Sequence, residues 1–313
     1  MKRFHYILIC FALIAGACSE ETDLRSRGEH YERLAVEALI TDQADQPQQV
    51  ILSKTIPYFE EASLSGVSGA LVTVSDGKDE VRFTEKEKGV YEAPAGFHGE
   101  QGGHYQLRIA LPDGDAYEAE ATMPHNGFRI DAIDYAFAGD KTMGLDSLWT
   151  VAIWGQDMES TDYYYITAGV NGAFYPFEMA EVTDDIYFSG NTISGFPIGT
   201  LMQYSQMREL YGDCAKYLES GDVVTLKALT LSRDYFDYLM AVMLNGMMSA
   251  IPLFSPQPAN CPTNIKNIRS GSPEDSGDDY MPAVGYFAAC PAISASVTVD
   301  DPFRPFYRRT LPE

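Results

Sequence analysis

Residues 104–123, HYQLRIALPDGDAYEAEATM, contain two segments of alternating apolar and polar side chains, separated by an Asp-Gly pair at 113–114. One face of the first segment carries three large side chains, those of Tyr105, Leu107 and Ile109. This period of two is typical of a half-buried strand, and Asp-Gly between two such segments is typical of a tight hairpin turn. The stretch therefore predicts an antiparallel β-hairpin.

Five further short segments with strand character precede this hairpin. They lie at residues 34–40, 49–53, 69–75, 80–84 and 89–91. Polar and glycine-containing turns separate them, and no segment between them has the period of a helix. Seven or so short strands at this spacing are typical of a β-sandwich of about 90 residues. We therefore predict an Ig-like or transthyretin-like β-sandwich domain over residues 32–125.

A second β-rich domain is predicted for residues 126–313, because proline, a short polar stretch and glycine interrupt the strand pattern at 124–127. Strand character returns at residues 129–138, 148–154, 163–170, 223–231, 283–289 and 293–299. Residues 171–215 follow neither period, so we expect long loops with short strands there. One amphipathic helix is expected near 232–248, with Ser232 as its N-cap and a Met-rich stripe packed into the core. The predicted fold class is mainly β.

The N-terminus has the pattern of a lipoprotein signal peptide over residues 1–17. Lys2 and Arg3 precede an apolar run that is too short to cross a bilayer, which takes roughly 20 residues. The small residues at 15–17 lead directly to Cys18 and resemble the bacterial lipobox. We predict that Cys18 is lipidated, because acyl chains such as palmitate on one cysteine anchor a protein firmly. An ordinary cleaved signal with an incidental cysteine is the alternative.

An acidic tether is predicted for residues 18–31, where Ser19 is followed by Glu20 and Glu21. This run resembles the surface-export signal of Bacteroidota lipoproteins, and it predicts an outer-membrane protein that faces the cell exterior. A solvated tether on the periplasmic side is the alternative. The formal net charge of −23 and the lack of a basic stripe argue against nucleic acid as a partner.

Three cysteines remain when Cys10 and Cys18 are set aside, namely Cys214, Cys261 and Cys290. An oxidising compartment permits one disulfide among them, but the sequence does not select the pair. Their spacing does not match a zinc knuckle. We therefore expect no metal and no cofactor.

Catalytic motifs are missing from the sequence, which has no HExxH, GxSxG, GxGxxG or phosphate-loop pattern. We therefore expect that the protein is not an enzyme. His98 and His104 could approach each other across a hairpin to bind a metal, and Asp184 with Asp185 could bind calcium. Solvated strand histidines and acidic turns are the commoner interpretations of such residues.

Aromatic residues are a better indication of a binding surface. Five of them lie in stretches that contain glycine and proline, namely Phe174, Tyr175, Phe177, Tyr187 and Phe196. Exposed rings at these positions could stack on a ligand or dock a partner. Alternatively, these loops fold back and bury the rings.

Short strings in a fixed order along most of the chain resemble the Bacteroidota lipoproteins grouped as domain of unknown function 4249. They include LAVEALITD at 34–42, GHYQL at 103–107, SRDYFDYL at 232–239, TNI at 263–265 and GYF at 285–287. The resemblance implies a lipoprotein signal, no catalytic motif, and a gene that often neighbours an outer-membrane TonB-dependent receptor. It therefore implies a non-enzymatic accessory protein that binds a receptor barrel or its cargo, with the ligand unknown.

Two other functions remain open at this point. One is a surface glycan or peptide hydrolase with an unrecognised site, and the other is an adhesin. The tail at residues 300–313 runs past the usual glycine-aromatic ending of the resemblance. Its Arg304, Arg308 and Arg309 are therefore peculiar to this chain.

Overall fold

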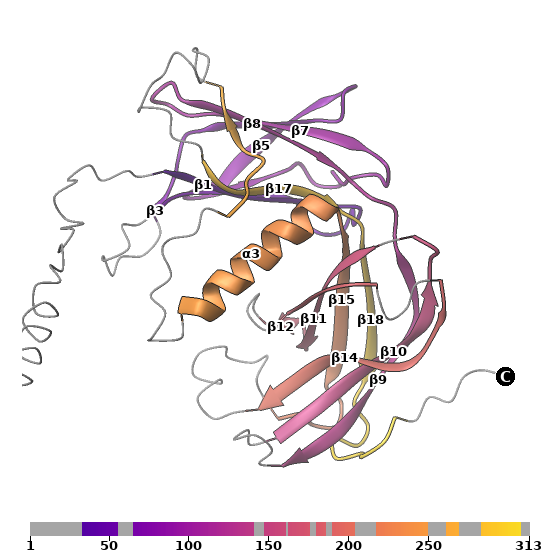
Figure 1. Ribbon diagram of the computed structural model, residues 1–313. Coiled ribbons are helices and arrows are strands. Elements are labelled where there is room, and N and C mark those ends of the chain that lie inside the picture. The colour runs from indigo at the N-terminus through magenta and orange to yellow at the C-terminus, as the bar shows by residue number, and fades with distance from the viewer. Residues whose placement is uncertain are drawn as a thin grey trace, which may run out of the picture.

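The computed structural model describes residues 33–55, 65–140, 147–160, 162–175, 180–185, 190–203, 217–249, 261–268 and 283–307. These residues form a mainly β structure with a single helix among them (Figure 1). The N-terminal sheet lies at the top of this view, and the strands from the middle of the chain lie below the helix. The predicted mainly β class with one helix is confirmed.

Eight strands from the first half of the chain form most of one ten-stranded sheet. They are β1 (Leu34–Thr41), β2 (Gln49–Lys54), β3 (Ser65–Gly66), β4 (Leu71–Ser75), β5 (Glu80–Glu87), β6 (Val90–Glu92), β7 (His104–Ala110) and β8 (Ala116–Thr122). The predicted hairpin is present as β7 and β8, which pair antiparallel. β5 pairs with β4 through its first half and with β6 through its second half, so the sheet curls over at this strand.

Two strands from far along the chain complete this sheet. β17 (Val284–Cys290) pairs parallel with β1, and β16 (Lys266–Asn267) pairs antiparallel with β8. Both strands lie within residues 126–313, so the N-terminal sheet takes strands from both of the predicted domains. The division into domains at residue 125 stays a prediction.

Asn264 joins the two ends of the curled sheet. Its Nδ2 donates to the carbonyl oxygen of Glu120 in β8 at 3.0 Å and to that of Phe287 in β17 at 2.8 Å. Its Oδ1 accepts a hydrogen bond from the backbone N–H of Phe287 at 3.0 Å. One side chain therefore supplies the hydrogen bonds that a neighbouring strand supplies elsewhere in the sheet.

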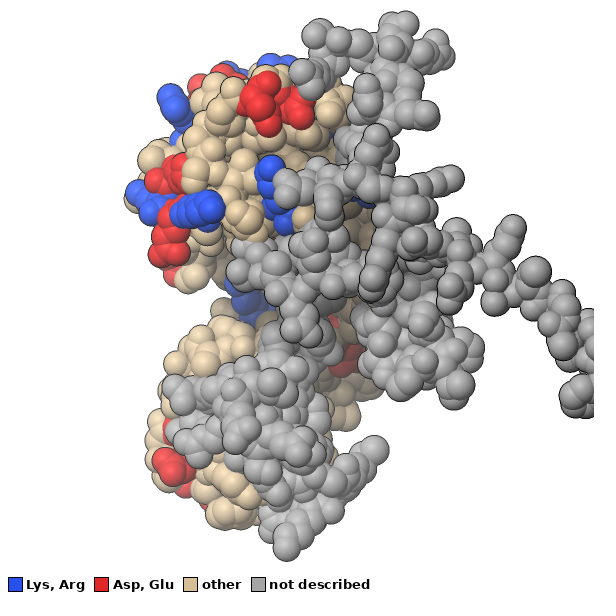
Figure 2. Space-filling view, turned by 90° about the vertical axis from the view of Figure 1, so that its left-hand side faces the viewer, with Lys and Arg blue, Asp and Glu red and all other residues tan. Residues whose placement is uncertain are grey.

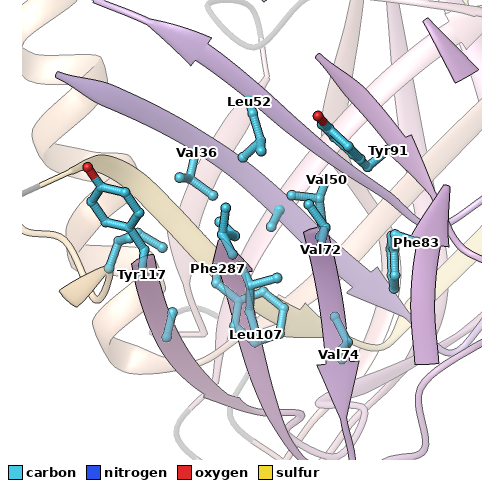
Figure 3. Close-up of a cluster of buried hydrophobic side chains, with 14 of the residues drawn as sticks. Val36, Val50, Leu52, Val72, Val74, Phe83, Tyr91, Leu107, Tyr117 and Phe287 are labelled. Carbon is cyan, nitrogen blue, oxygen red and sulfur yellow. The ribbon is translucent and has the colours of Figure 1, made fainter. Parts of the chain in front are cut away.

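A hydrophobic core fills the space between the two halves of the curled sheet. In Figure 3, side chains from both halves point toward one another, among them Val36, Leu52, Val72, Leu107 and Phe287. All five are fully buried. Successive side chains of a strand point to opposite faces, so the alternation seen in the sequence separates the core face from the outer face.

Strands from the middle of the chain, together with one strand near its C-terminal end, form two smaller sheets that pack face to face. One contains β9 (Phe128–Asp140), β10 (Ser147–Asp157) and β14 (Thr192–Gln203). The other contains β11 (Tyr163–Val170), β12 (Ala173–Phe174), β13 (Glu181–Asp184), β15 (Val223–Leu231) and β18 (Ala292–Thr298). Their shared core includes the fully buried Tyr135, Trp149 and Tyr164.

The long strand β14 differs from the sequence prediction, which expected loops with short strands across residues 171–215. Gly195, Pro197 and Gly199 interrupt the apolar alternation within this strand. β14 is an edge strand, and its pairing with β10 shifts register at two places. Proline and glycine are tolerated at such edges and bulges, which is why the strand forms without a visible period.

Helix α3 (Arg233–Ser249) follows β15 directly and runs beneath the N-terminal sheet in Figure 1. Ser232 caps it, because its Oγ accepts a hydrogen bond from the backbone N–H of Tyr235 at 3.3 Å. Asp234 lies in the first turn, where the helix dipole favours a negative charge. Leu239 is buried against Leu231 and neighbouring strand residues. The predicted helix and its N-cap are confirmed.

The C-terminal tail packs on the β9–β10 sheet. The backbone N–H of Phe137 donates to the carbonyl oxygen of Arg304 at 2.7 Å. The buried guanidinium of Arg304 forms an ion pair with Asp134 and lies 4.3 Å from the ring centroid of Tyr135. Arg304 thus has a structural role, whereas residues 308–313 lie outside the described residues.

Charged side chains are unevenly distributed on the face shown in Figure 2. They gather over the upper part of the molecule, which is the N-terminal sheet, and the described lower part shows few. β5 illustrates the cause, since Arg82, Lys86 and Glu87 are exposed while Phe83 points into the core. A polar outer face therefore covers part of this sheet.

Candidate functional site

A groove lies between α3 and the outer face of the N-terminal sheet. Its volume is about 660 Å³, and its lining comes from β1, β2, β15, β17 and α3. The residues that matter most for its chemistry are Glu37, Ile51, Lys227, Tyr235, Tyr238 and Tyr286. A volume of this size is typical of a small-ligand site.

The period of β1 explains the sheet side of the groove. Val36 and Ile40 are buried in the core, so Glu37 and Leu39 are directed to the opposite face. Tyr286 lies beside Glu37 because the two residues are direct partners in the parallel β1–β17 ladder. The sheet therefore places a carboxylate next to a phenol on its outer face.

The period of α3 explains the helix side. Tyr235, Tyr238, Leu239 and Val242 line the groove at spacings of three, four and seven residues, which puts them on one helical face. The cap at Ser232 sets where the helix begins.

Three tyrosine rings pack together in the groove. The ring centroid of Tyr286 lies 5.1 Å from that of Tyr235 and 5.0 Å from that of Tyr238, and the last two are 6.0 Å apart. The angles between ring planes run from 11° to 32°, so the rings are close to parallel. Burial raises the pKa of Tyr238 to about 12 and that of Tyr286 to about 12, and it raises the pKa of Tyr235 as well. The phenols are therefore neutral and can both donate and accept hydrogen bonds.

The three phenol hydroxyls, the Glu37 carboxylate and the Lys227 ammonium group have no partners within the described part of the chain, whereas Thr41, Gln48 and Gln49 of the same lining form hydrogen bonds. No described residue forms a hydrogen bond with the hydroxyls of Tyr235, Tyr238 or Tyr286. Neither Glu37 nor Lys227 forms an ion pair with a described residue. Free donors and acceptors beside packed aromatic rings are what a binding site offers to a ligand.

The five aromatic residues proposed from the sequence do not line this groove. Phe174 is 37% exposed at the end of β12. Tyr175 is buried in the core between the two smaller sheets, and Phe196 is partly buried against that core. Phe177 and Tyr187 lie outside the described residues. Burial of Tyr175 matches the alternative in which the chain folds back over its rings, and a ligand contact at Phe174 stays a prediction.

The residues considered for metal binding have other contacts. Nδ1 of His98 lies 2.9 Å from the carbonyl oxygen of Gly96, and Nδ1 of His104 lies 3.0 Å from Oγ1 of Thr122. Within the described ranges, no group of three His, Cys, Asp or Glu side chains is arranged to hold a metal ion. Asp184 and Asp185, considered as calcium ligands, lie at the end of β13 and directly after it.

The cysteines are only partly described. Cys261 and Cys290 are free thiols, and burial raises the pKa of the Cys290 thiol. Asn245 Nδ2 donates to Cys261 Sγ at 3.2 Å. Cys18 and Cys214 lie outside the described residues, so lipidation and any disulfide with Cys214 stay predictions.

Sequence reasoning missed the tyrosines of the groove. It identified the apolar stripe of the helix but not Tyr235 and Tyr238 beside it. One signal was available, because Glu37 and Tyr286 are polar or amphipathic residues on the outward face of otherwise apolar strands. The pairing that brings those two residues together has no local signature in the sequence.

Comparisons with other proteins place the chain in a family. No described helix is long and apolar enough to cross a membrane. No curated protein matches the chain. A family model described as a domain of unknown function (DUF4249) matches residues 20–294, which is most of the chain and includes every described strand from β1 to β17. The match ends within β18, so the tail around Arg304 lies beyond it. The protein therefore belongs to the DUF4249 family.

Proposed function

We propose that the protein is a non-enzymatic lipoprotein that acts as an accessory binding protein for a TonB-dependent receptor or its cargo. In this proposal an acylated Cys18 anchors it in the outer membrane, and the acidic tether at residues 18–31 displays it to the cell exterior. The β sheets form a platform, and the groove beneath α3 is the binding site. The family resemblance stated from the sequence supports the receptor as partner.

The groove carries this proposal. Its walls come from two different sheets and a helix, and it contains a cluster of three tyrosines together with a carboxylate and an ammonium group that pair with no described residue. Tyrosine supplies a large contact area and a polar tip, a combination that is enriched where proteins bind partners and ligands.

Co-purification from the outer-membrane fraction tests the proposal. The full chain with its intact anchor is solubilised in mild detergent and captured, and a TonB-dependent receptor barrel is expected among the proteins identified by mass spectrometry. Cys18→Ser is expected to release the chain from the membrane fraction. Tyr238→Ala is expected to reduce recovery of the receptor or of its cargo, whereas Phe306→Ala serves as a control because Phe306 is 78% exposed and does not line the groove.

Repeated recovery of the anchored chain without any receptor barrel would overturn the receptor proposal. Retention of Cys18→Ser in the membrane fraction would overturn the anchor. If Tyr238→Ala and Phe306→Ala reduce the recovery of the receptor or its cargo equally, the groove is not the binding site.

A further inference from the structure

The groove has opposite charges toward its two ends. Glu37 lies at one end, beside Tyr286 in the β1–β17 ladder. At the other end, Thr41 of β1 pairs with Cys290, the last residue of β17. The next strand, β18, begins at Ala292, which pairs with Leu229 of β15. Lys227 lies two residues from Leu229 along β15, so it belongs to the end of the groove that contains Thr41.

The separation of these ends follows from the strand geometry. Thr41 is the fourth residue after Glu37 in β1. At about 3.3 Å per residue, Glu37 and Thr41 are about 13 Å apart along β1. An extended peptide spans at most about 3.3–3.6 Å per residue, so this length corresponds to about three to four residues.

Carboxylates of α3 also act on the tyrosine cluster. After burial, which has the largest effect, Glu37 raises the pKa of Tyr235 and Tyr238, and Asp234 and Asp237 raise the pKa of Tyr286. Arg233 is the cation nearest to them on α3, and it is engaged by Asp237 at 3.0 Å. The faces of the tyrosine rings are themselves regions of negative potential and attract cations. An ammonium group is therefore favoured beside Glu37 and the rings, and a carboxylate is favoured beside Lys227.

We propose that the groove binds a short peptide in extended form, with its ammonium group at Glu37 and its carboxylate at Lys227. This inference rests on the proposed role of the groove as the binding site and names the class of ligand. The tyrosine rings contact the apolar side chains of the peptide between its ends, and the phenol hydroxyls, which bond to no described residue, form hydrogen bonds with its amide groups. A neutral saccharide could stack on the same rings, but it has no charged groups that would pair with Glu37 and Lys227.

Titration calorimetry on the full chain in mild detergent tests this inference. The probe is alanyl-phenylalanyl-alanine with free termini, compared with its N-acetylated form, its C-terminal amide and the neutral sugar maltotriose. The free peptide is expected to bind most tightly. Glu37→Gln is expected to weaken the free peptide roughly three- to tenfold and to leave the N-acetylated form unchanged.

The other variants complete the design. Lys227→Gln is expected to weaken the free peptide by a similar factor and to leave the C-terminal amide unchanged. Glu87→Gln and Lys86→Gln are matched controls, because both residues are exposed on β5 and neither lines the groove. Circular dichroism melting confirms that each variant is folded. Tyr238→Phe keeps the ring and removes only the hydroxyl, so it measures what the hydroxyl contributes to peptide binding.

Three results would overturn the inference. One is that millimolar peptide gives no binding heat. Another is that Glu37→Gln and Lys227→Gln bind the free peptide as well as the two controls do. The third is that maltotriose binds more tightly than the peptide. Peptide binding without a co-purifying receptor would overturn the receptor proposal alone, and a co-purifying receptor without peptide binding would overturn this inference alone.

Discussion

Replacing Asn264 with alanine is expected to loosen the joint between the two ends of the N-terminal sheet. The side chain makes three hydrogen bonds, two to carbonyl oxygens of Glu120 and Phe287 and one from the N–H of Phe287. Each contributes about 0.5–1.5 kcal/mol, and the N–H of the buried Phe287 is left without this acceptor. We therefore expect the free energy of unfolding to fall by about 2–4 kcal/mol.

Urea unfolding of the full chain, followed by circular dichroism, measures this loss. Hydrogen exchange locates it, because the amides of β17 and of the segment around Asn264 should exchange faster while those of β9 and β10 remain unchanged. Gln106→Ala is a matched control, since this half-buried amide on β7 makes no side-chain hydrogen bond to a described residue. The control is expected to change stability by less than about 0.5 kcal/mol.

A loss below about 0.5 kcal/mol for Asn264→Ala would refute this reasoning, because it would mean that core packing alone holds the sheet ends together. Equal losses for Asn264→Ala and Gln106→Ala would refute it too. Asn264→Asp keeps the acceptor but turns an oxygen toward two carbonyl groups. We expect it to be at least as destabilised as the alanine variant.

Three further predictions concern other parts of the molecule. Gly285→Ala is expected to lower the free energy of unfolding by more than about 2 kcal/mol. The reason is that Gly285 has a φ of +96° and that an added Cβ would collide with the carbonyl oxygen of Val36. An unchanged midpoint in urea unfolding would contradict this prediction. Arg304→Leu removes the buried cation beside Asp134 and is expected to lower the free energy of unfolding by about 3–5 kcal/mol in the same assay. Adding Asp134→Leu is expected to recover part of this loss. A double variant that is no more stable than Arg304→Leu would show that the ion pair is not the cause. Burial raises the pKa of Asp157 in the folded protein above its value in the unfolded chain, which is about 3.9. Protonated Asp157 therefore stabilises the fold fully below pH of about 3.9, and this stability is lost as the pH rises through the raised folded-state pKa. Asp157→Asn should therefore gain stability relative to the original chain as the pH rises from about 4 to 7, and a constant difference in urea midpoints across this range would show the reasoning to be wrong.

Much of the local structure was readable from short stretches of sequence. The Asp-Gly pair at 113–114 predicted the β7–β8 hairpin, and Ser232 predicted the start of α3. Both depend on interactions between residues a few positions apart, namely backbone turn geometry and a side-chain cap. β14 was missed for a reason of the same kind, because Gly195 and Pro197 hide its alternation.

The groove could not be read in this way. Alternation in β1 shows that Glu37 faces away from the core, but it does not name what lies opposite. That neighbour is Tyr286, which the parallel pairing with β17 supplies from the far end of the chain. Helical spacing puts Tyr235 and Tyr238 on one face without saying which sheet that face covers.

The sequence by itself determined the mainly β class, most strand positions, the helix with its cap and the family resemblance, because each depends on residues close together in the chain or on their order along it. Tertiary structure alone decided that β17 completes the first sheet, that Asn264 joins the sheet ends, and that three tyrosines meet beside Glu37. The physical reason is that a strand's side-chain period specifies the face that is buried and leaves its hydrogen-bonding edges open to any strand. Which strand fills each edge is settled only when the whole chain packs.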